Sequence, residues 1–365
     1  MNKKITYAQV GDNYDTKDPI KKLAQIAARK TILKEKDFKE VSDTRGESAF
    51  VWQQGPTLMA SVVEGLGTKN LVADQMRKVT GKTYYDVIGH DTVATIINDL
   101  ITVGAKPRVI HAYWAIEDNS WLEDKKRMKD FITGWRDGCK TSMATWGGGE
   151  TPTLKGIVEK NTIDLGGASV GVINPTSRLI TDRKLKKGDR ILLLKSNGVN
   201  CNGLSLARAV AKKLPKSYAT KLPNGKAFGE AILTKTNIYA KLVQDLFAAK
   251  VDIHYISNIT GHGLRKIMRS PKEFNYVVEN VFEPQEIFLF IQKHANLSDY
   301  EAYETFNMGQ DYAIFVSKKD VNKAQDIIRK NRFQSINAGY IKDGPRQVVI
   351  KPKNIIYTSE TLDLR

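Results

Sequence analysis

Small and charged residues alternate in Glu-Gly-Leu-Gly-Thr-Lys, residues 64–69, directly after an apolar run at residues 58–63. Glycines such as Gly65 and Gly67 let backbone N–H groups approach an anion, while Thr68 adds a hydroxyl and Lys69 a positive charge. The spacing differs from that of a P-loop, which requires Gly-x4-Gly-Lys-Ser/Thr. These residues alone therefore leave two interpretations open, a phosphate-binding loop and a tight turn with a surface lysine.

A second group of polar residues lies on one stripe of a helix predicted within residues 89–107. Asp91, Thr95 and Asn98 recur at helical spacing, and Asp99 lies beside them. Carboxylates suit Mg²⁺, which proteins usually hold with one or two carboxylates plus substrate phosphates. The stripe therefore predicts a magnesium site, with a merely polar helix face as the alternative.

Four further segments combine glycine with polar residues near the expected ends of helices and strands. A helix N-terminus preceded by Asn and Gly is a natural anion site. Ordinary caps and turns give the same patterns, so each segment is a weak signal by itself. The segments are 146–152 (WGGGETP), 196–203 (SNGVNCNG), 257–267 (SNITGHGLRKI) and 306–316 (FNMGQDYAIFV).

The elements that must position these residues are strands and helices mixed in both halves of the chain. Hydrophobic periodicity predicts one helix within residues 89–107 and others at 121–141, 203–213, 227–249 and 319–331. It predicts strands at 58–63, 109–116, 162–173, 190–195, 286–292, 312–316 and 346–351, and a tail or edge strand after 353. Because strands and helices do not alternate strictly, we expect an α+β fold in two domains, 1–175 and 176–365.

Composition excludes several classes of protein. The 365 residues include only two cysteines, and the five histidines show no zinc-binding spacing. The N-terminus lacks the apolar core of a signal peptide, and no apolar run is long enough to span a bilayer, so we expect a cytoplasmic protein. The net charge of +17 favours anionic partners, but the lysines are scattered, which argues against nucleic acid as a partner.

Taken in order, the motifs resemble those of aminoimidazole ribonucleotide synthetase, also called phosphoribosylformylglycinamidine cyclo-ligase. The similarity runs from about residue 5 to residue 350, and the ordered set is more specific than any one motif. The matching segments are Glu64–Lys69, Gly89–Asp91, Asn98–Leu100, Gly104–Pro107, Gly148–Thr151, Asp164–Val172, Ser196–Leu206, residues 259–263 and residues 306–309.

This resemblance implies a two-domain fold, in which the N-terminal domain binds ATP and pairs across a homodimer, followed by a C-terminal α/β domain. It also implies a reaction on a small phosphorylated substrate. ATP activates the formyl oxygen of formylglycinamidine ribonucleotide, the amidine nitrogen closes the imidazole ring, and ADP and phosphate leave. Phosphoryl transfer depends on positioned charges and a divalent metal more than on a protein nucleophile, which agrees with the lack of a catalytic triad.

The resemblance also implies roles for individual residues. Lys69 and Asp99 would be catalytic, and Glu64, Asp91 and Asp99 would hold Mg²⁺. The residues expected at the substrate are Asn202, Gly203, Asn258, Thr260 and Gly261. Those expected at ATP are Gly65, Gly67, Thr68, Lys69, Asp91, Asn98, Gly148, Gly149, Glu150 and Thr151.

The loop at residues 44–50, where the family usually has a Gly-Gly-Phe-Gly-type sequence, and five single positions depart from the family pattern. Glu64 replaces Asp, Gln25 replaces Lys, Asn200 and Asn258 replace His, and His262 replaces Gly. Two alternatives therefore stay open. One is a different ATP-dependent enzyme of the same superfamily, which includes selenophosphate synthetase, thiamine monophosphate kinase and the hydrogenase maturation protein. The other is a non-catalytic protein that binds nucleotides or RNA.

Overall fold

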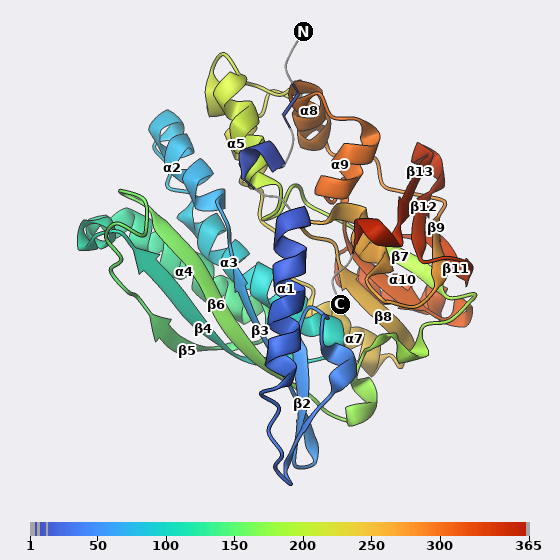
Figure 1. The fold of residues 1–365 in the computed structure, drawn as a ribbon. Helices are drawn as coiled ribbons and strands as arrows, with labels where there is room; N and C mark the ends of the chain where they lie inside the picture. Colours follow the sequence, from blue (N-terminus) through green and yellow to red (C-terminus); the bar gives the residue numbers. More distant parts are fainter. Residues whose placement is uncertain (1–3, 6–7, 12–13, 363–365) are drawn as a thin grey trace.

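The chain forms two β-sheets, each with helices of its own half (Figure 1). The computed structural model describes residues 4–5, 8–11 and 14–362. The first sheet has the strand order β1 (Phe38–Glu40), β2 (Phe50–Gln54), β3 (Thr57–Gly65), β6 (Ile163–Ile173), β4 (Lys106–Ile116) and β5 (Thr145–Glu150). The second has the order β13 (Ile355–Thr358), β12 (Gln347–Ile350), β9 (Phe274–Val278), β11 (Ser335–Asp343), β7 (Arg190–Lys195), β10 (Gln310–Val316) and β8 (Ile253–Asn258).

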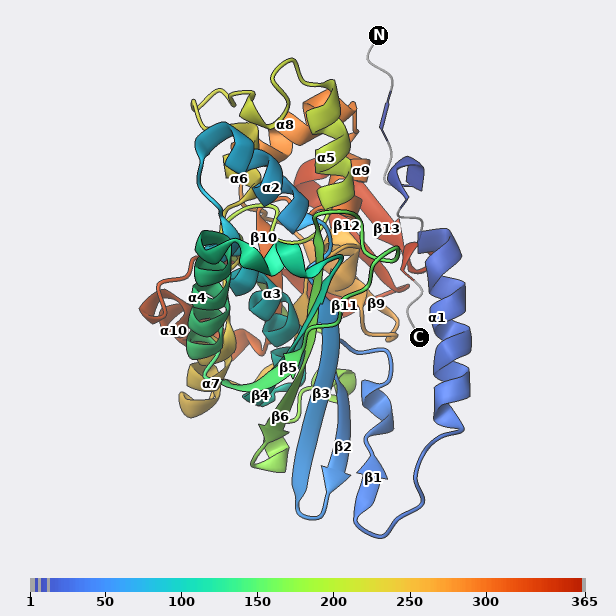
Figure 2. The same ribbon diagram turned by 90° about the vertical axis from the view of Figure 1, so that its left-hand side faces the viewer.

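Helix α3 (Tyr85–Leu100) packs against β3 and β6 of the first sheet and against α4 (Lys125–Thr141). A Cβ atom at Gly89 would lie 2.4 Å from the carbonyl oxygen of Phe131. Gly89, part of the predicted ligand motif, thus serves the close approach of two helices. Figure 2 shows α3 and α4 on one side of the strands and α1 (Tyr14–Arg29) on the other. Helix α2 (Lys69–Thr80) follows directly after the loop that leaves β3.

In the second sheet β10 and β8 are buried at every residue, as expected for strands covered on both faces. Helices α5 (Leu204–Lys213), α9 (Asp299–Thr305) and α10 (Val321–Lys330) belong to the same half. Short 3-10 helices join several elements, including η3 (Ile101–Val103), η4 (Asn119–Glu123) and η8 (Gly263–Met268). The predicted C-terminal edge strand is confirmed as β13. Among the described helices, none has the length and apolar character needed to cross a bilayer.

Two sequence predictions of secondary structure are wrong. Residues 286–292, predicted as a strand, lie in helix α8 (Glu286–Ala295). Ile287, Phe288 and Ile291 form its buried face while Leu289 is 51% exposed, so the short apolar run follows helical periodicity. The helix predicted at 227–249 is two helices, α6 (Phe228–Ile232) and α7 (Ala240–Ala248).

The segment between α6 and α7 is hydrogen-bonded to α3 and so joins the two halves of the molecule. Asn98 of α3 accepts a hydrogen bond from the backbone N–H of Tyr239 (3.1 Å) and donates one to the carbonyl of Asn237 (2.7 Å). The hydroxyl of Tyr312 on β10 donates to the carbonyl of Asn98 (3.1 Å). The polar stripe of α3 therefore faces the second half of the chain rather than solvent.

Candidate active site

A small polar cavity lies where α3 meets the second half of the chain, and its volume is about 80 Å³. Five segments contribute: the end of β3, the polar stripe of α3, the loop before α5, the segment between α6 and α7, and the turn after β8. Such a volume admits a few water molecules or the polar end of a larger ligand. The lining residues are Glu64, Gly65, Thr95, Asn98, Asp99, Asn200, Cys201, Asn202, Thr236, Asn258, Ile259 and Thr260.

Two carboxylates, Glu64 and Asp99, lie side by side at this cavity. Burial, and then the neighbouring charge of Asp99, raise the pKa of Glu64 to about 7. Asn258 donates from Nδ2 to Oδ1 of Asp99 at 2.7 Å, which fixes that side chain. Two like charges in a buried place favour a cation between them. The donor set therefore fits a divalent metal held by oxygen ligands.

Lys266 brings a buried amine to the same region from η8. It is 7% exposed, and burial, together with the charge of Arg269, lowers its pKa to about 7. The carboxylates of Asp99 and Glu64 act in the opposite direction. The sequence interpretation did not select Lys266, although it lies in the glycine-rich segment 257–267.

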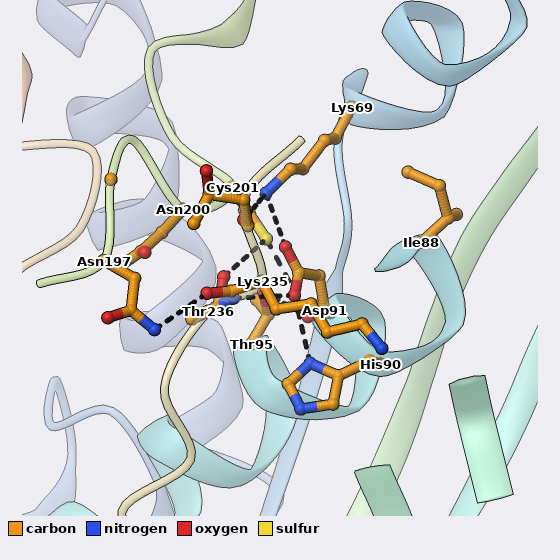
Figure 3. A network of polar contacts seen from close by, with 12 residues as sticks. Lys69, Ile88, His90, Asp91, Thr95, Asn197, Asn200, Cys201, Lys235 and Thr236 are labelled. Carbon is orange, nitrogen blue, oxygen red and sulfur yellow. Dashed lines mark hydrogen bonds and ion pairs between the residues drawn. The ribbon is translucent and has the colours of Figure 1, made fainter. Parts of the chain in front are cut away.

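Lys69 and Asp91, by contrast, are bonded to each other (Figure 3). Both side chains are completely buried, and Nζ of Lys69 lies 2.5 Å from Oδ2 of Asp91 and 2.9 Å from the carbonyl oxygen of Thr234. His90 and the backbone N–H of Thr236 reach the other oxygen of Asp91. Burial alone would raise the pKa of Asp91, but Lys69 and His90 hold it at about 2.

The structure therefore does not bring the three predicted metal ligands together. Glu64 and Asp99 line the cavity, whereas both oxygens of Asp91 already have partners and Asp91 does not line it. Within 4–5, 8–11 and 14–362, no group of three or more His, Cys, Asp and Glu side chains is arranged to hold a metal. Asp91 therefore lies apart from Glu64 and Asp99 in this structure, and its role as a metal ligand stays a prediction.

The loop after β3 leads into the N-terminus of α2. Gly65 lines the cavity, while Gly67 is exposed and adopts a φ of +73°. Thr68 is the N-cap residue of α2, yet its side chain caps no backbone N–H. Its Oγ1 is buried and lacks a hydrogen-bond partner among the described residues. A free hydroxyl at a helix N-terminus suits an anion.

Residues 148–151 lie elsewhere. Gly148, Gly149 and Glu150 belong to the edge strand β5, and these residues and Thr151 are exposed and do not line the cavity. A Cβ atom at Gly149 would lie 2.2 Å from the carbonyl oxygen of Ala112. Close strand packing therefore accounts for this glycine without a ligand.

The loop before α5 supplies Asn200, Cys201 and Asn202 to the cavity. Gly203 ends it with a φ of +73°, and a Cβ atom there would lie 2.1 Å from the ring of Phe306. Gly203 thus shapes the loop but does not line the cavity. Burial, followed by the charge of Asp91, raises the pKa of the Cys201 thiol to about 11, so the thiol stays protonated.

Asn258 at the end of β8 and Ile259 and Thr260 in the turn that follows line the cavity, while Gly261 is buried outside the lining. His262, which replaces a family glycine, faces Asp18 of α1 at 3.2 Å. Burial lowers its pKa to about 4, although Asp18 opposes this. His262 is therefore a neutral contact between η8 and α1 at neutral pH.

Thus seven predicted site residues line the cavity: Glu64, Gly65, Asn98, Asp99, Asn202, Asn258 and Thr260. Sequence reasoning did not assign Thr236 and Cys201 to the site. Thr95 was already visible in the helical stripe, but Thr236 sits in a segment predicted as continuous helix and gave no signal.

Comparisons with known proteins agree along the chain. The N-terminal domain of AIR synthase related proteins matches residues 46–173, and their C-terminal domain matches residues 186–351. A phosphoribosylformylglycinamidine cyclo-ligase of Methanococcus vannielii is 31% identical over 340 residues, which cover 93% of this chain and 93% of that protein.

Solved structures share the fold at low sequence identity. AaThiL complexed with AMPPCP and TMP has a TM-score of 0.62 at 12% identity and covers 92% of this chain and 93% of that one. Hydrogenase maturation protein HypE in complex with ATP has a TM-score of 0.56 at 15% identity and covers 81% of this chain and 82% of that one. These similarities show the fold alone.

Proposed function

The chain belongs to the family of AIR synthase related proteins, and from this premise we propose that it is an ATP-dependent cyclo-ligase of purine biosynthesis. It closes the ring of formylglycinamidine ribonucleotide to give aminoimidazole ribonucleotide, ADP and phosphate. The observation that carries this proposal is the cyclo-ligase relative that matches over 93% of the chain. The polar cavity supports it, because motifs from both domains meet there.

We propose that Glu64 and Asp99 hold Mg²⁺, with Asn258 fixing Asp99. The metal would neutralise charge on the phosphates of ATP. Their adjacent carboxylates supply the hard oxygen ligands that this ion prefers. Glu64, although one methylene longer than the family's Asp, reaches the same cavity as Asp99. The change from Asp to Glu is therefore compatible with a retained metal site.

The nucleotide phosphates are proposed to lie at the loop of Gly65, Gly67 and Thr68. Backbone N–H groups at the N-terminus of α2 and the unpartnered Thr68 hydroxyl suit phosphate oxygens. Lys69 would act through Asp91, by fixing the start of α2 against α3. The exposed Gly148–Thr151 segment stays a predicted nucleotide contact at the edge of the sheet. HypE, of the same fold, was solved with ATP.

The substrate is proposed to lie against Asn202, Asn258 and Thr260, which line the same cavity as Glu64 and Asp99. Gly203 and Gly261 then shape the two turns. Lys266 adds a buried positive charge that can offset the negative charge gathered by two carboxylates and a triphosphate. These residues bind and orient; phosphoryl transfer needs no protein nucleophile.

A homodimer through the first sheet is also proposed. The face of this sheet opposite α3 leaves Val63 77% exposed and Tyr113 40% exposed. An exposed apolar area of this kind marks a contact surface. The family resemblance implies that a second copy of the chain binds there. Val63→Arg should convert a dimer into a monomer in sedimentation velocity, whereas Val79→Arg on α2, 52% exposed, should leave it dimeric. A monomeric wild-type chain would refute the dimer.

Release of ADP from ATP, measured with and without formylglycinamidine ribonucleotide, tests the enzyme itself. ADP should appear only when the ribonucleotide is present. Turnover that ignores the ribonucleotide would favour another enzyme of the same fold. A cytoplasmic location, which the two unpaired cysteines suit, is part of the same proposal.

A further inference from the structure

The partly buried Asn200 and the buried Asp311 form a hydrogen-bonded pair at the wall of the cavity. Nδ2 of Asn200 donates a hydrogen bond to Oδ2 of Asp311 at 2.9 Å. Asp311 lies on β10, is 2% exposed, and also accepts a hydrogen bond from the hydroxyl of Tyr239 at 2.6 Å. Asn200 lines the cavity, but Asp311 does not. The Asp311 carboxylate therefore affects the cavity only through its hydrogen bond to the Asn200 amide.

The hydrogen bond to Asp311 fixes the orientation of the Asn200 amide group. An ionised carboxylate only accepts hydrogen bonds, so it selects the NH₂ end of the amide. The amide oxygen must then point away from Asp311. Oδ1 of Asn200 is buried and has no hydrogen-bond partner among the described residues. A buried acceptor without a donor is costly, unless a ligand supplies the donor.

We propose that Asn200 offers this amide oxygen to an N–H group of the substrate, and that Asp311 is the positioning residue that keeps the oxygen turned towards the cavity. The inference rests on the proposed function and sharpens it. Formylglycinamidine ribonucleotide carries amide and amidine N–H groups, whereas its phosphate has no N–H to donate. Asn200 is therefore a specificity-determining contact for the reacting end of the substrate.

The backbone of Asn200 allows a clean test. Its φ is +55°, a conformation that glycine adopts without strain, so Asn200→Gly removes the amide while keeping the loop. Asp311→Asn replaces a carboxylate, which only accepts hydrogen bonds, with an amide that has an accepting oxygen and a donating NH₂ group. Because Tyr239 still donates to the new oxygen, the new NH₂ faces Asn200 and favours the inverted amide.

Both variants should raise KM for formylglycinamidine ribonucleotide, Asn200→Gly by about thirtyfold and Asp311→Asn by about tenfold. KM for ATP should change less than about twofold, since the contact is to the other substrate. In the Asn200→Gly background, Asp311→Asn should have almost no further effect on KM, because it acts through the missing amide. Asn354→Gly is the matched control, because this exposed asparagine also has a positive φ, of +53°, and does not line the cavity.

An unchanged KM for the ribonucleotide in Asn200→Gly overturns the proposal, whether or not Asp311→Asn folds. An equal effect of Asp311→Asn in both backgrounds would show that Asp311 is merely structural. Wild-type turnover separates the two levels of inference. If the wild type shows no ribonucleotide-dependent turnover, the proposed function and this contact both fall; if it does, these variants judge the contact alone.

Discussion

Two acidic sites on the same side of the first sheet behave in opposite ways. Asp91 is surrounded by Lys69, His90 and the N–H of Thr236, and its pKa is held at about 2. Glu64 stands beside a second carboxylate, and its pKa rises to about 7. The first site is electrostatically complete within the protein. At the second, the buried amine of Lys266 offsets the repulsion between the two carboxylates only in part, which is why we propose a bound cation there.

The largest expected effect belongs to Asp99. Asp99→Asn should lower metal-dependent ADP release on the order of a thousandfold, because a neutral amide is a poor ligand for Mg²⁺ and several kcal/mol of charge stabilisation are lost. Steady-state kinetics at several Mg²⁺ concentrations measure this. Asp86→Asn, an exposed change on the same helix, should retain wild-type rates. Equal rates in both variants would remove Asp99 from the site.

Lys69→Met should act on stability. Removing the lysine leaves the completely buried Asp91 without its ion pair, which costs about 3–5 kcal/mol of unfolding free energy. Urea denaturation measures the loss, and adding Asp91→Asn should restore part of it. Lys78→Met on the exposed face of α2 is the control. Unchanged stability with abolished turnover would instead support the direct catalytic role that the motif suggested.

A smaller effect is expected from pH and Glu64. The raised pKa means that the folded protein binds more protons than the unfolded chain between pH 4.5 and about 7, so Glu64 makes stability fall as pH rises through this window. Glu64→Gln should therefore stabilise the metal-free protein at pH 8 by about 1–2 kcal/mol and much less at pH 4.5.

Urea denaturation at the two pH values measures this difference. Mg²⁺ with ATP should stabilise the wild type more than Glu64→Gln, because a bound cation relieves the repulsion from Asp99. A destabilised Glu64→Gln at pH 8 would contradict the account of the carboxylate pair.

Site residues that follow a local helical periodicity can be predicted from the sequence better than site residues that depend on long-range contacts. The stripe of α3 was visible from spacing, since Asn98 and Asp99 follow from helical geometry alone. The burial of Lys69 could not be predicted from the sequence, because it depends on Asp91 and on the carbonyl of Thr234, a contact across 165 positions. The partnership of Asn200 with Asp311 spans 111 positions and joins a loop to a strand of the second sheet. Only the fold brings such residues together.

Two predictions of secondary structure failed for a similar reason. Residues 286–292 are a short apolar run, and their environment makes them helix α8 rather than a strand. The gap between α6 and α7 has helical periodicity around it, but its backbone is held open by Asn98 and Asp91 of the other half. Tertiary contacts there override local preference.

The most direct test of the central claim is to measure both products of one reaction. Wild-type protein with ATP, Mg²⁺ and formylglycinamidine ribonucleotide should yield ADP and aminoimidazole ribonucleotide in equal amounts by chromatography. The Asp99→Asn variant should yield neither at a comparable rate. ADP formed without the imidazole product, or equal product from Asp99→Asn, would contradict the account.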